Sequence, residues 1–164
     1  MPNDHLDLQI PIFDTGAVFI SDRVLAVSNG YGELRHYDIR ASKKVTSNVA
    51  ITEKELMLTH VVHSKINEHH LYVVSQEGNP LLLDRRYNCR VIRKMPGAKG
   101  SVRDCKVLAA SETDLNEDSN ELLLTVGCDR HLRVFDPKQE SQKDTSCGAA
   151  YLKHKLNCLL LHDE

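Results

Sequence analysis

Histidine is the residue type of this chain whose clustering most resembles a metal site. Four histidines stand close together in the sequence: His60, His63, His69 and His70. None of them is paired with a cysteine at a spacing typical of metal ligands. His60 and His63 are three residues apart in an extended run, so their side chains point to opposite faces of a strand. We expect His69 and His70 to lie at the surface end of a strand, and we predict no metal site.

The segment Cys128-Asp129-Arg130-His131 raises the hypothesis of a catalytic thiolate–imidazole pair. Adjacent positions of a turn rarely aim their side chains at each other, and Asp129 has a structural explanation given below. The sequence also contains no Gly-rich phosphate loop, no G-x-S-x-G and no H-E-x-x-H. We therefore predict a protein that is not an enzyme and that has no cofactor.

The strongest charge asymmetry lies between residues 85 and 106. Its basic residues are Arg85, Arg86, Arg90, Arg93, Lys94, Lys99, Arg103 and Lys106. Asp104 is the only opposing acid, so one hypothesis is contact with RNA phosphates or with an acidic partner. The alternative is the solvated face of an outer strand and its loop. Tyr87 is the only interleaved aromatic residue, which gives little support to base stacking.

Composition sets the class of protein. The 164 residues are one domain or a piece of one, with 41% hydrophobic residues, 27% charged residues and a net charge of −2. That near-neutral balance argues against a domain built mainly to hold nucleic acid. The five cysteines are scattered and form no CxxC, which indicates reduced thiols in a cytosolic or nuclear protein. No apolar run is long enough to cross a bilayer, so we expect no membrane contact.

The elements that position these residues are predicted to be short strands joined by turns. Runs rich in Val, Leu and Ile alternate with Gly, Asn and Asp, and no stretch has a helical period over three turns. Three hairpins stand out: 23–28 with 33–38, 70–75 with 80–84, and 121–127 with 131–136. One further strand is predicted before each hairpin and one after it. Four strands per repeat, with a period near 45 residues, is the β-propeller pattern.

The third strands share a WD-type ending. They close on Tyr37-Asp38, Leu83-Asp84 and Phe135-Asp136, so the aspartates are 46 and 52 residues apart. In such a blade the turn acid, Asp129, accepts hydrogen bonds from nearby backbone N–H groups. The aromatic Phe135 packs between neighbouring blades. The other two repeats match less well, because Leu83 replaces the aromatic residue and neither turn contains an acid.

These repeats predict an all-β fold, an incomplete WD-type propeller of about three four-stranded blades and one orphan strand. The predicted segments are a lead-in (1–15), three blades (16–50, 51–96 and 97–154), an acidic insertion (109–121) and a closing strand (155–164). We interpret the chain as the C-terminal portion of a larger propeller. The lead-in segment LDLQIPIFD either packs on the propeller itself or docks on a partner, and the acidic insertion is expected to be a solvated loop.

With these residues in place, the chain resembles a known family, that of the WD-repeat nucleolar factor of large-ribosomal-subunit assembly, WD repeat-containing protein seventy-four. The likeness rests on NDHLDLQIPIFD (3–14), GSVRD (100–104), LRVFD (132–136) and YLKHKLNCLLL (151–161). It implies a seven-bladed ring, a nuclear and nucleolar location, and a scaffold role in precursor large subunits and ribosomal RNA processing. Implied partners are proteins of those precursors, an AAA-type ATPase and ribosomal RNA.

Two alternatives to the ribosomal hypothesis stay open at the level of sequence. One is a WD-repeat adaptor of another class, such as a substrate receptor of a ubiquitin ligase. The other is a non-functional gene-model fragment. Propellers carry many unrelated functions, so the repeat pattern alone does not choose among the three.

Overall fold

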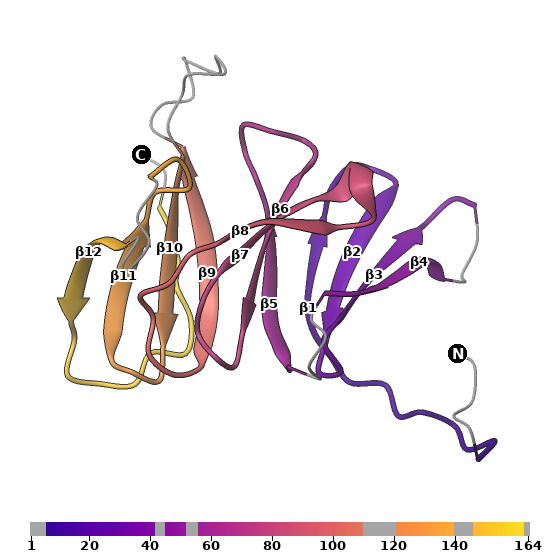
Figure 1. Cartoon of the computed structure of the whole chain (residues 1–164), viewed down its shortest axis with the longest axis horizontal. Helices are drawn as coiled ribbons and strands as arrows, with labels where there is room; N and C mark the ends of the chain where they lie inside the picture. Colours follow the sequence, from indigo (N-terminus) through magenta and orange to yellow (C-terminus); the bar gives the residue numbers. More distant parts are fainter. Residues whose placement is uncertain (1–5, 42–44, 52–55, 110–120, 140–145, 163–164) are drawn as a thin grey trace.

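The computed structural model describes residues 6–41, 45–51, 56–109, 121–139 and 146–162. Within those ranges the chain forms twelve strands and one short 3₁₀ helix. The strands make three antiparallel sheets of four, in the orders β1-β2-β3-β4, β5-β6-β7-β8 and β12-β11-β10-β9. Figure 1 shows the three sheets side by side, like neighbouring blades of a fan. The described part of the chain contains no helix that is long and apolar enough to span a membrane.

Each sheet is a continuous piece of the sequence. The first contains β1 (Asp14–Phe19), β2 (Val24–Asn29), β3 (Glu33–Asp38) and β4 (Val45–Ala50). The second contains β5 (Leu58–His63), β6 (His70–Ser75), β7 (Leu81–Asp84), η1 (Arg85–Tyr87) and β8 (Arg90–Lys94). The third contains β9 (Val102–Ala109), β10 (Glu121–Gly127), β11 (His131–Phe135) and β12 (Ser146–Tyr151). The prediction of an incomplete all-β propeller is confirmed.

The turn between the second and third strand is built in the same way in all three sheets. A residue with positive φ stands six positions before the strand-ending aspartate: Gly32 (φ 81°), Gly78 (φ 96°) and Arg130 (φ 64°). Glycine adopts this conformation without steric cost, whereas Arg130 does not. Gly78 is further constrained, because a Cβ there would lie 2.3 Å from the carbonyl oxygen of Gly100.

The hydrophobic core lies between the sheets. The first seam, between the first and second sheets, includes Ala26, Leu34, Val61, Leu71 and Leu83. The second seam, between the second and third sheets, includes Tyr72, Val74, Met95, Leu123 and Phe135. The first strands of the sheets are neighbours, since β1 contacts β5 and β5 contacts β9. Each sheet therefore packs face to face on the next, with its first strand innermost.

The two outer sheets each have one face that no described strand covers. On the first sheet, strand register places Phe19, Leu25, Tyr37 and Val45 on one row, opposite to the first seam. Phe19 is 61% exposed. On the third sheet the corresponding row is Lys106, Leu124, Val134 and Gly148. The arrangement is an open arc of blades, as Figure 1 also shows.

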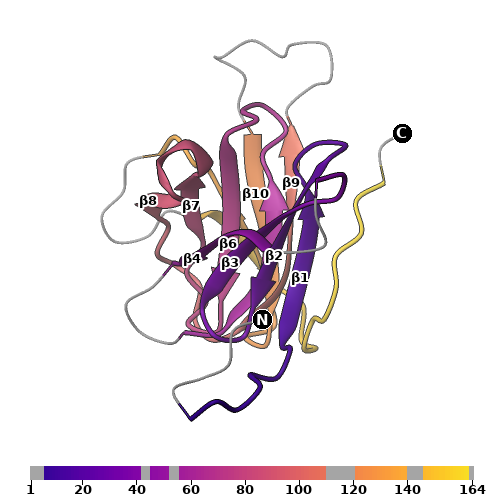
Figure 2. The same cartoon turned by 90° about the vertical axis from the view of Figure 1, so that its right-hand side faces the viewer.

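The C-terminal segment follows the third sheet without joining it. Residues 155–162, predicted as part of a closing strand, pair with no strand in the described part of the chain. The Leu156 N–H donates to the Gly127 carbonyl at 3.3 Å, and the Leu159 N–H donates to the Asp104 carboxylate at 2.8 Å. Figure 2 shows this segment, in yellow, passing outside the strands.

Alanine substitution at two equivalent positions, Phe135 and Tyr37, is expected to lower the free energy of unfolding by different amounts. Phe135 and Tyr37 both precede a strand-ending aspartate, but Phe135 is fully buried in the second seam and Tyr37 is only half-buried. Phe135→Ala is expected to lower the free energy of unfolding by about 3–5 kcal/mol, because it leaves a cavity. Tyr37→Ala should cost less than about 1.5 kcal/mol. Urea unfolding of both variants measures the difference, and equal costs would contradict this account of the core.

Candidate interaction sites

The three strand-ending aspartates do the same local work. Each accepts a hydrogen bond from the backbone N–H two residues further on, which closes an Asx-turn after the third strand. The pairs are Asp38 with Arg40 at 3.0 Å, Asp84 with Arg86 at 2.9 Å, and Asp136 with Lys138 at 2.8 Å. These aspartates therefore shape the loops that lead into the outermost strands, and their contacts are structural.

The turn acid Asp129 holds the third hairpin. Its Oδ1 accepts from the His131 N–H at 3.2 Å, and its Oδ2 pairs with the guanidinium of Arg133, which is buried. His131 turns its Nδ1 toward the Asp129 carbonyl oxygen at 2.7 Å. Cys128 accepts instead from Arg103 Nε at 3.4 Å. The imagined Cys128–His131 pair is not assembled in the structure.

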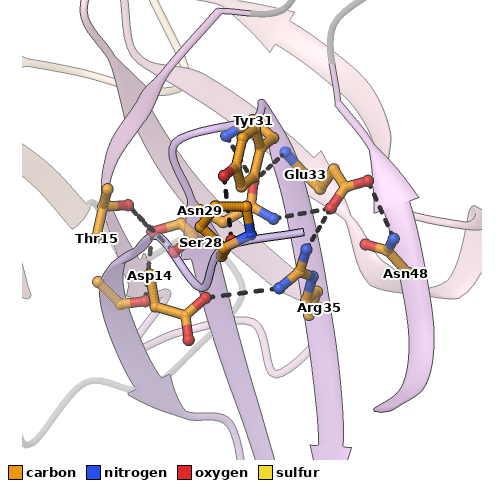
Figure 3. A network of polar contacts seen from close by, with 10 residues as sticks. Asp14, Thr15, Ser28, Asn29, Tyr31, Glu33, Arg35 and Asn48 are labelled. Carbon is orange, nitrogen blue, oxygen red and sulfur yellow. Dashed lines mark hydrogen bonds and ion pairs between the residues drawn. The ribbon is translucent and has the colours of Figure 1, made fainter. Parts of the chain in front are cut away.

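In the first blade the side-chain amide of Asn29 does what the turn acid does in the third blade. This role was not predicted from the sequence. Asn29 is fully buried and its Oδ1 accepts from the N–H groups of Tyr31 (3.0 Å) and Glu33 (2.8 Å). Its own amide donates to Glu33 Oε2 at 2.8 Å, and Figure 3 shows this network. Arg35 pairs with Glu33 at 2.8 Å and, at 3.7 Å, with Asp14.

The Glu33 carboxylate collects several donors in this network. Burial opposes its ionisation, but hydrogen bonds from Asn29, Arg35 and Asn48 outweigh burial and lower the pKa of Glu33. The Asn48 amide reaches Oε1 at 3.1 Å. An asparagine four residues before an acid, with a cation two residues after that acid, is the sequence signal that could have identified this turn.

The lead-in segment contacts the first blade through Pro11 and Phe13. The Phe13 ring packs edge-on against Tyr31, with centroids 6.2 Å apart, and the Phe13 carbonyl accepts from the Gly30 N–H at 2.8 Å. The Tyr31 hydroxyl donates to the Pro11 carbonyl at 3.1 Å. Three large apolar side chains of the segment are 60–72% exposed: Leu6, Leu8 and Ile12. Most of the apolar surface of this segment therefore faces solvent.

Glu121 corrects one interpretation of the acidic insertion. Residues 110–120 lie outside the described residues, but Glu121 is the first residue of β10 and is buried. Ser64 Oγ lies 2.8 Å from each of its carboxylate oxygens, and the Lys65 N–H donates at 3.2 Å. The Tyr72 hydroxyl also donates to it, at 2.5 Å. Glu121 is thus an internal acceptor that joins the second and third sheets, because a buried carboxylate is tolerated only with such donors.

A cavity of about 200 Å³ adjoins this cluster and is lined by Ile66, Asn67, His70, Leu82 and Pro137, with Tyr72 and Glu121. Burial raises the pKa of the Tyr72 hydroxyl, and the Glu121 charge raises it further. The phenol therefore remains protonated and can donate to Glu121 at any physiological pH.

The structure does not gather the eight predicted basic residues into one strip. Arg85 and Arg86 lie in η1; Arg90, Arg93 and Lys94 lie on the outermost strand β8; Lys99 lies in a loop; Arg103 and Lys106 lie on the innermost strand β9. Several already have internal partners. Arg93 donates to the Pro137 carbonyl at 2.6 Å, and Lys94 lies 3.9 Å from Glu77. Only the group at η1 and the start of β8 remains together.

A second hollow, of about 480 Å³, lies between the first two sheets beside η1. It is lined by Val24, His36, Ser47, Arg85, Arg86, Asn88 and Cys89. Cys89 Sγ is 3.9 Å from His36 Nε2. Burial raises the pKa of Cys89 to about 11, and burial followed by the Arg85 charge lowers the pKa of His36. Both groups are therefore neutral near pH 7, which does not suit nucleophilic chemistry.

The four clustered histidines do not converge on one point, although His63 and His69 both contact Glu68. His60 Nε2 is 3.3 Å from Asp104, His63 Nε2 is 3.1 Å from the Glu68 carbonyl, and His69 Nε2 is 3.4 Å from the Glu68 carboxylate. His70 Nε2 lies 3.5 Å from Asn67 Nδ2. Among the described residues, no three His, Cys, Asp or Glu side chains are grouped so that they could hold a metal ion.

Comparison with known proteins identifies the family. The chain is 31% identical over 163 residues to WD repeat-containing protein 74 of Bos taurus and of Homo sapiens, which covers 97% of this chain. A WD repeat-containing protein of Dictyostelium discoideum is 24% identical over 99% of the chain. The chain belongs to the WD-repeat family. It spans 29–38% of the length of these curated relatives. No protein-family model matches the sequence.

Solved structures support the same fold for this WD-repeat chain. The WD40 β-propeller domain of Doa1 superposes with a TM-score of 0.65 at 16% identity, over 85% of this chain and 41% of that one. The likeness at this identity concerns the fold alone. The repeated hairpins and strand-ending aspartates are therefore WD-repeat architecture, and interactions of this chain must be sought on the surfaces described above.

The Glu121 cluster predicts a large effect from one substitution. Glu121→Ala removes the acceptor for Ser64, Tyr72 and the Lys65 N–H, and should lower the free energy of unfolding by about 3 kcal/mol. Glu121→Gln keeps one carbonyl oxygen and should cost roughly half as much. Urea unfolding of the two variants, beside the parent chain, measures both. A Glu121→Ala protein as stable as the parent would disprove a structural role.

Asp84 predicts an acid-dependent contribution to stability. Hydrogen bonds from Arg86 lower the pKa of Asp84 from 3.8 to about 2. Because the pKa is lower in the folded chain, the stabilisation is complete above the unfolded value of 3.8 and is lost as pH falls toward 2. The urea midpoint of the parent should exceed that of Asp84→Asn near neutral pH, and the two should converge across this range. A difference that is independent of pH would exclude the ion pair as its cause.

Proposed function

We propose that this chain supplies part of a non-enzymatic propeller scaffold in the assembly of the large ribosomal subunit, within the nucleus and nucleolus. The observation that carries the proposal is the likeness to WD repeat-containing protein 74 over 97% of the chain. The proposal is also supported by the family resemblance of segments 3–14 and 151–161, because these segments are not part of the pattern that all WD repeats share. On this proposal the chain works with other proteins of precursor large subunits, an AAA-type ATPase and ribosomal RNA.

The surface chemistry supports a role in binding proteins. WD-repeat propellers hold rigid loops around a stable scaffold, and the loops and extensions carry the contacts. In this chain the lead-in places Leu6, Leu8 and Ile12 in solvent beside a firmly attached Phe13. An apolar segment anchored at one end is suited to docking on a partner protein. We assign this docking role to the lead-in segment.

The assignment is tested by gentle purification of the tagged, full gene product from its own cells. Precursor large-subunit RNA and early assembly factors are expected to co-purify. Recovery of ubiquitin-ligase subunits without ribosomal RNA would overturn the ribosomal function and favour a WD-repeat adaptor of another class.

The same experiment with two matched variants tests the lead-in. Ile12→Asp places a charge on the exposed lead-in and should reduce recovery of assembly factors about tenfold or more, as for an interface hot spot. Ile92→Asp is the control, because Ile92 is similarly exposed but lies on β8. Equal recovery with both variants would remove the lead-in from the interface while leaving the scaffold assignment intact.

A further inference from the structure

The turn at η1 is closed by Asp84 and carries three side chains, of which Arg85 is half-buried and Arg86 and Tyr87 are exposed. Asp84 accepts from the Arg86 N–H and also pairs with its guanidinium, with Nη2 to Oδ2 at 2.9 Å. Beyond the turn, Asn88 and Cys89 both have positive φ, 53° and 52°. Two successive left-handed residues reverse the chain sharply into β8. The turn is thereby fixed before any ligand arrives, which lowers the entropic cost of binding.

The hollow beside this turn is rich in hydrogen-bond donors. Arg85, His36, Ser47 and the Asn88 amide line its 480 Å³. Arg86 is neutralised by Asp84, but no hydrogen bond or ion pair to another described residue engages the Arg85 guanidinium. A cation held next to a hydroxyl, an imidazole and an amide is chemistry suited to a phosphate group, which offers several acceptor oxygens.

An exposed aromatic ring belongs to the same turn as Arg85, Arg86 and Asn88, which line the hollow. Tyr87 is 67% exposed, and the Arg86 guanidinium carbon lies 5.7 Å from the centre of its ring. This contact restrains the ring while leaving most of it open. Arg90, also exposed, begins the adjoining strand opposite Asp84. A nucleobase stacks on an exposed aromatic ring while its backbone phosphate meets a neighbouring cation, so this pair of groups favours a nucleic acid over a phosphopeptide.

We propose that this turn is a binding site for single-stranded RNA, with a backbone phosphate beside Arg85 and an unstacked base on Tyr87. The site, defined by Arg85, Tyr87 and the donors His36, Ser47 and Asn88, deepens the proposed function and rests on its ribosomal RNA partner. It reduces the eight basic residues singled out in the sequence to the few at one turn. Single strands are favoured over duplex because only an unpaired base can turn out onto the ring.

The test is fluorescence anisotropy of the 164-residue chain with labelled oligouridylate of about ten nucleotides, within the usual site size for such binding. Tyr87→Ala should weaken binding at least about fivefold, and Tyr87→Phe should restore it, because stacking needs the ring and not the hydroxyl. Arg85→Ala should weaken binding and lower the salt slope of log K by about 0.7, the value for one phosphate contact on a single strand.

Arg103→Ala is the matched control for charge, since Arg103 is exposed but lies on β9. Equal losses from Arg85→Ala and Arg103→Ala would reduce the binding to general electrostatics and overturn the site. Tighter binding of a phosphoserine peptide than of RNA, unaffected by Tyr87→Ala, would reassign the hollow to a phosphoprotein. Unchanged thermal unfolding of the variants would show that any loss is in binding.

Ultraviolet crosslinking in cells gives a second readout in the full gene product. Mass spectrometry should find a nucleotide adduct on the peptide that contains Tyr87, and Arg85→Ala should reduce it. Co-purification of assembly factors without any adduct on this peptide would overturn the RNA site and leave the scaffold function standing. If no assembly factors co-purify with the protein that carries no substitution, the scaffold function itself is contradicted.

Discussion

Face-to-face packing of neighbouring sheets is the interaction on which the rest of this structure depends. Most buried apolar side chains belong to the two clusters between neighbouring sheets, so the core is built by pairs of sheets. Leu83 and Phe135 occupy equivalent positions and each fills the seam toward the preceding sheet. The hydrophobic gain therefore belongs to pairs of blades, as in other repeat proteins. Loops, turns and buried polar groups are arranged around these seams.

The polar groups fall into two kinds with different jobs. Asp38, Asp84 and Asp136 satisfy backbone N–H groups at turns, where they fix loop shape locally. Glu121 instead crosses a seam, bringing a carboxylate of β10 to donors from the second sheet. Apolar packing alone allows two sheets to slide relative to each other. A buried acceptor fixes their relative position, because its hydrogen-bond donors must lie at defined places. In the second seam, apolar packing therefore holds the sheets together and the hydrogen bonds of Glu121 align them.

Local pattern was enough to predict the sheets, because each hairpin is specified by nearby residues. Alternating apolar strands, a turn residue that tolerates positive φ and a strand-ending aspartate recur within one repeat. Arg130 is an exception, because it is a non-glycine residue with positive φ at the position that Gly32 and Gly78 occupy in the other hairpins. The strands of the predicted hairpins agree with the structure to within one residue, whereas β1 begins at Asp14, two residues before the predicted first blade, where its register is irregular.

Non-local contacts explain what the sequence did not predict. Glu121 is the last acid of a polar run in the sequence, and only its partners Ser64, just after β5, and Tyr72, on β6, show that it is internal. The basic run from 85 to 106 is continuous in sequence, but it crosses from an outermost strand to an innermost one. The sequence of this run does not show that its two ends lie far apart, because the two strands belong to different blades. His36 and Ser47 of the first sheet line one hollow together with Arg85, Arg86 and Asn88 of the second, and this grouping cannot be read from the sequence.

The separation of seams from turns also explains how such a scaffold can acquire ligands. The η1 turn is held by Asp84 and by two left-handed residues, all within the second blade. Its exposed side chains contribute little to either seam, so they can change without loosening the stack of sheets. The hollow beside it nevertheless needs the first sheet, because His36 and Ser47 come from β3 and β4. Blade packing therefore builds the walls of the site, and the turn supplies the groups that select its ligand.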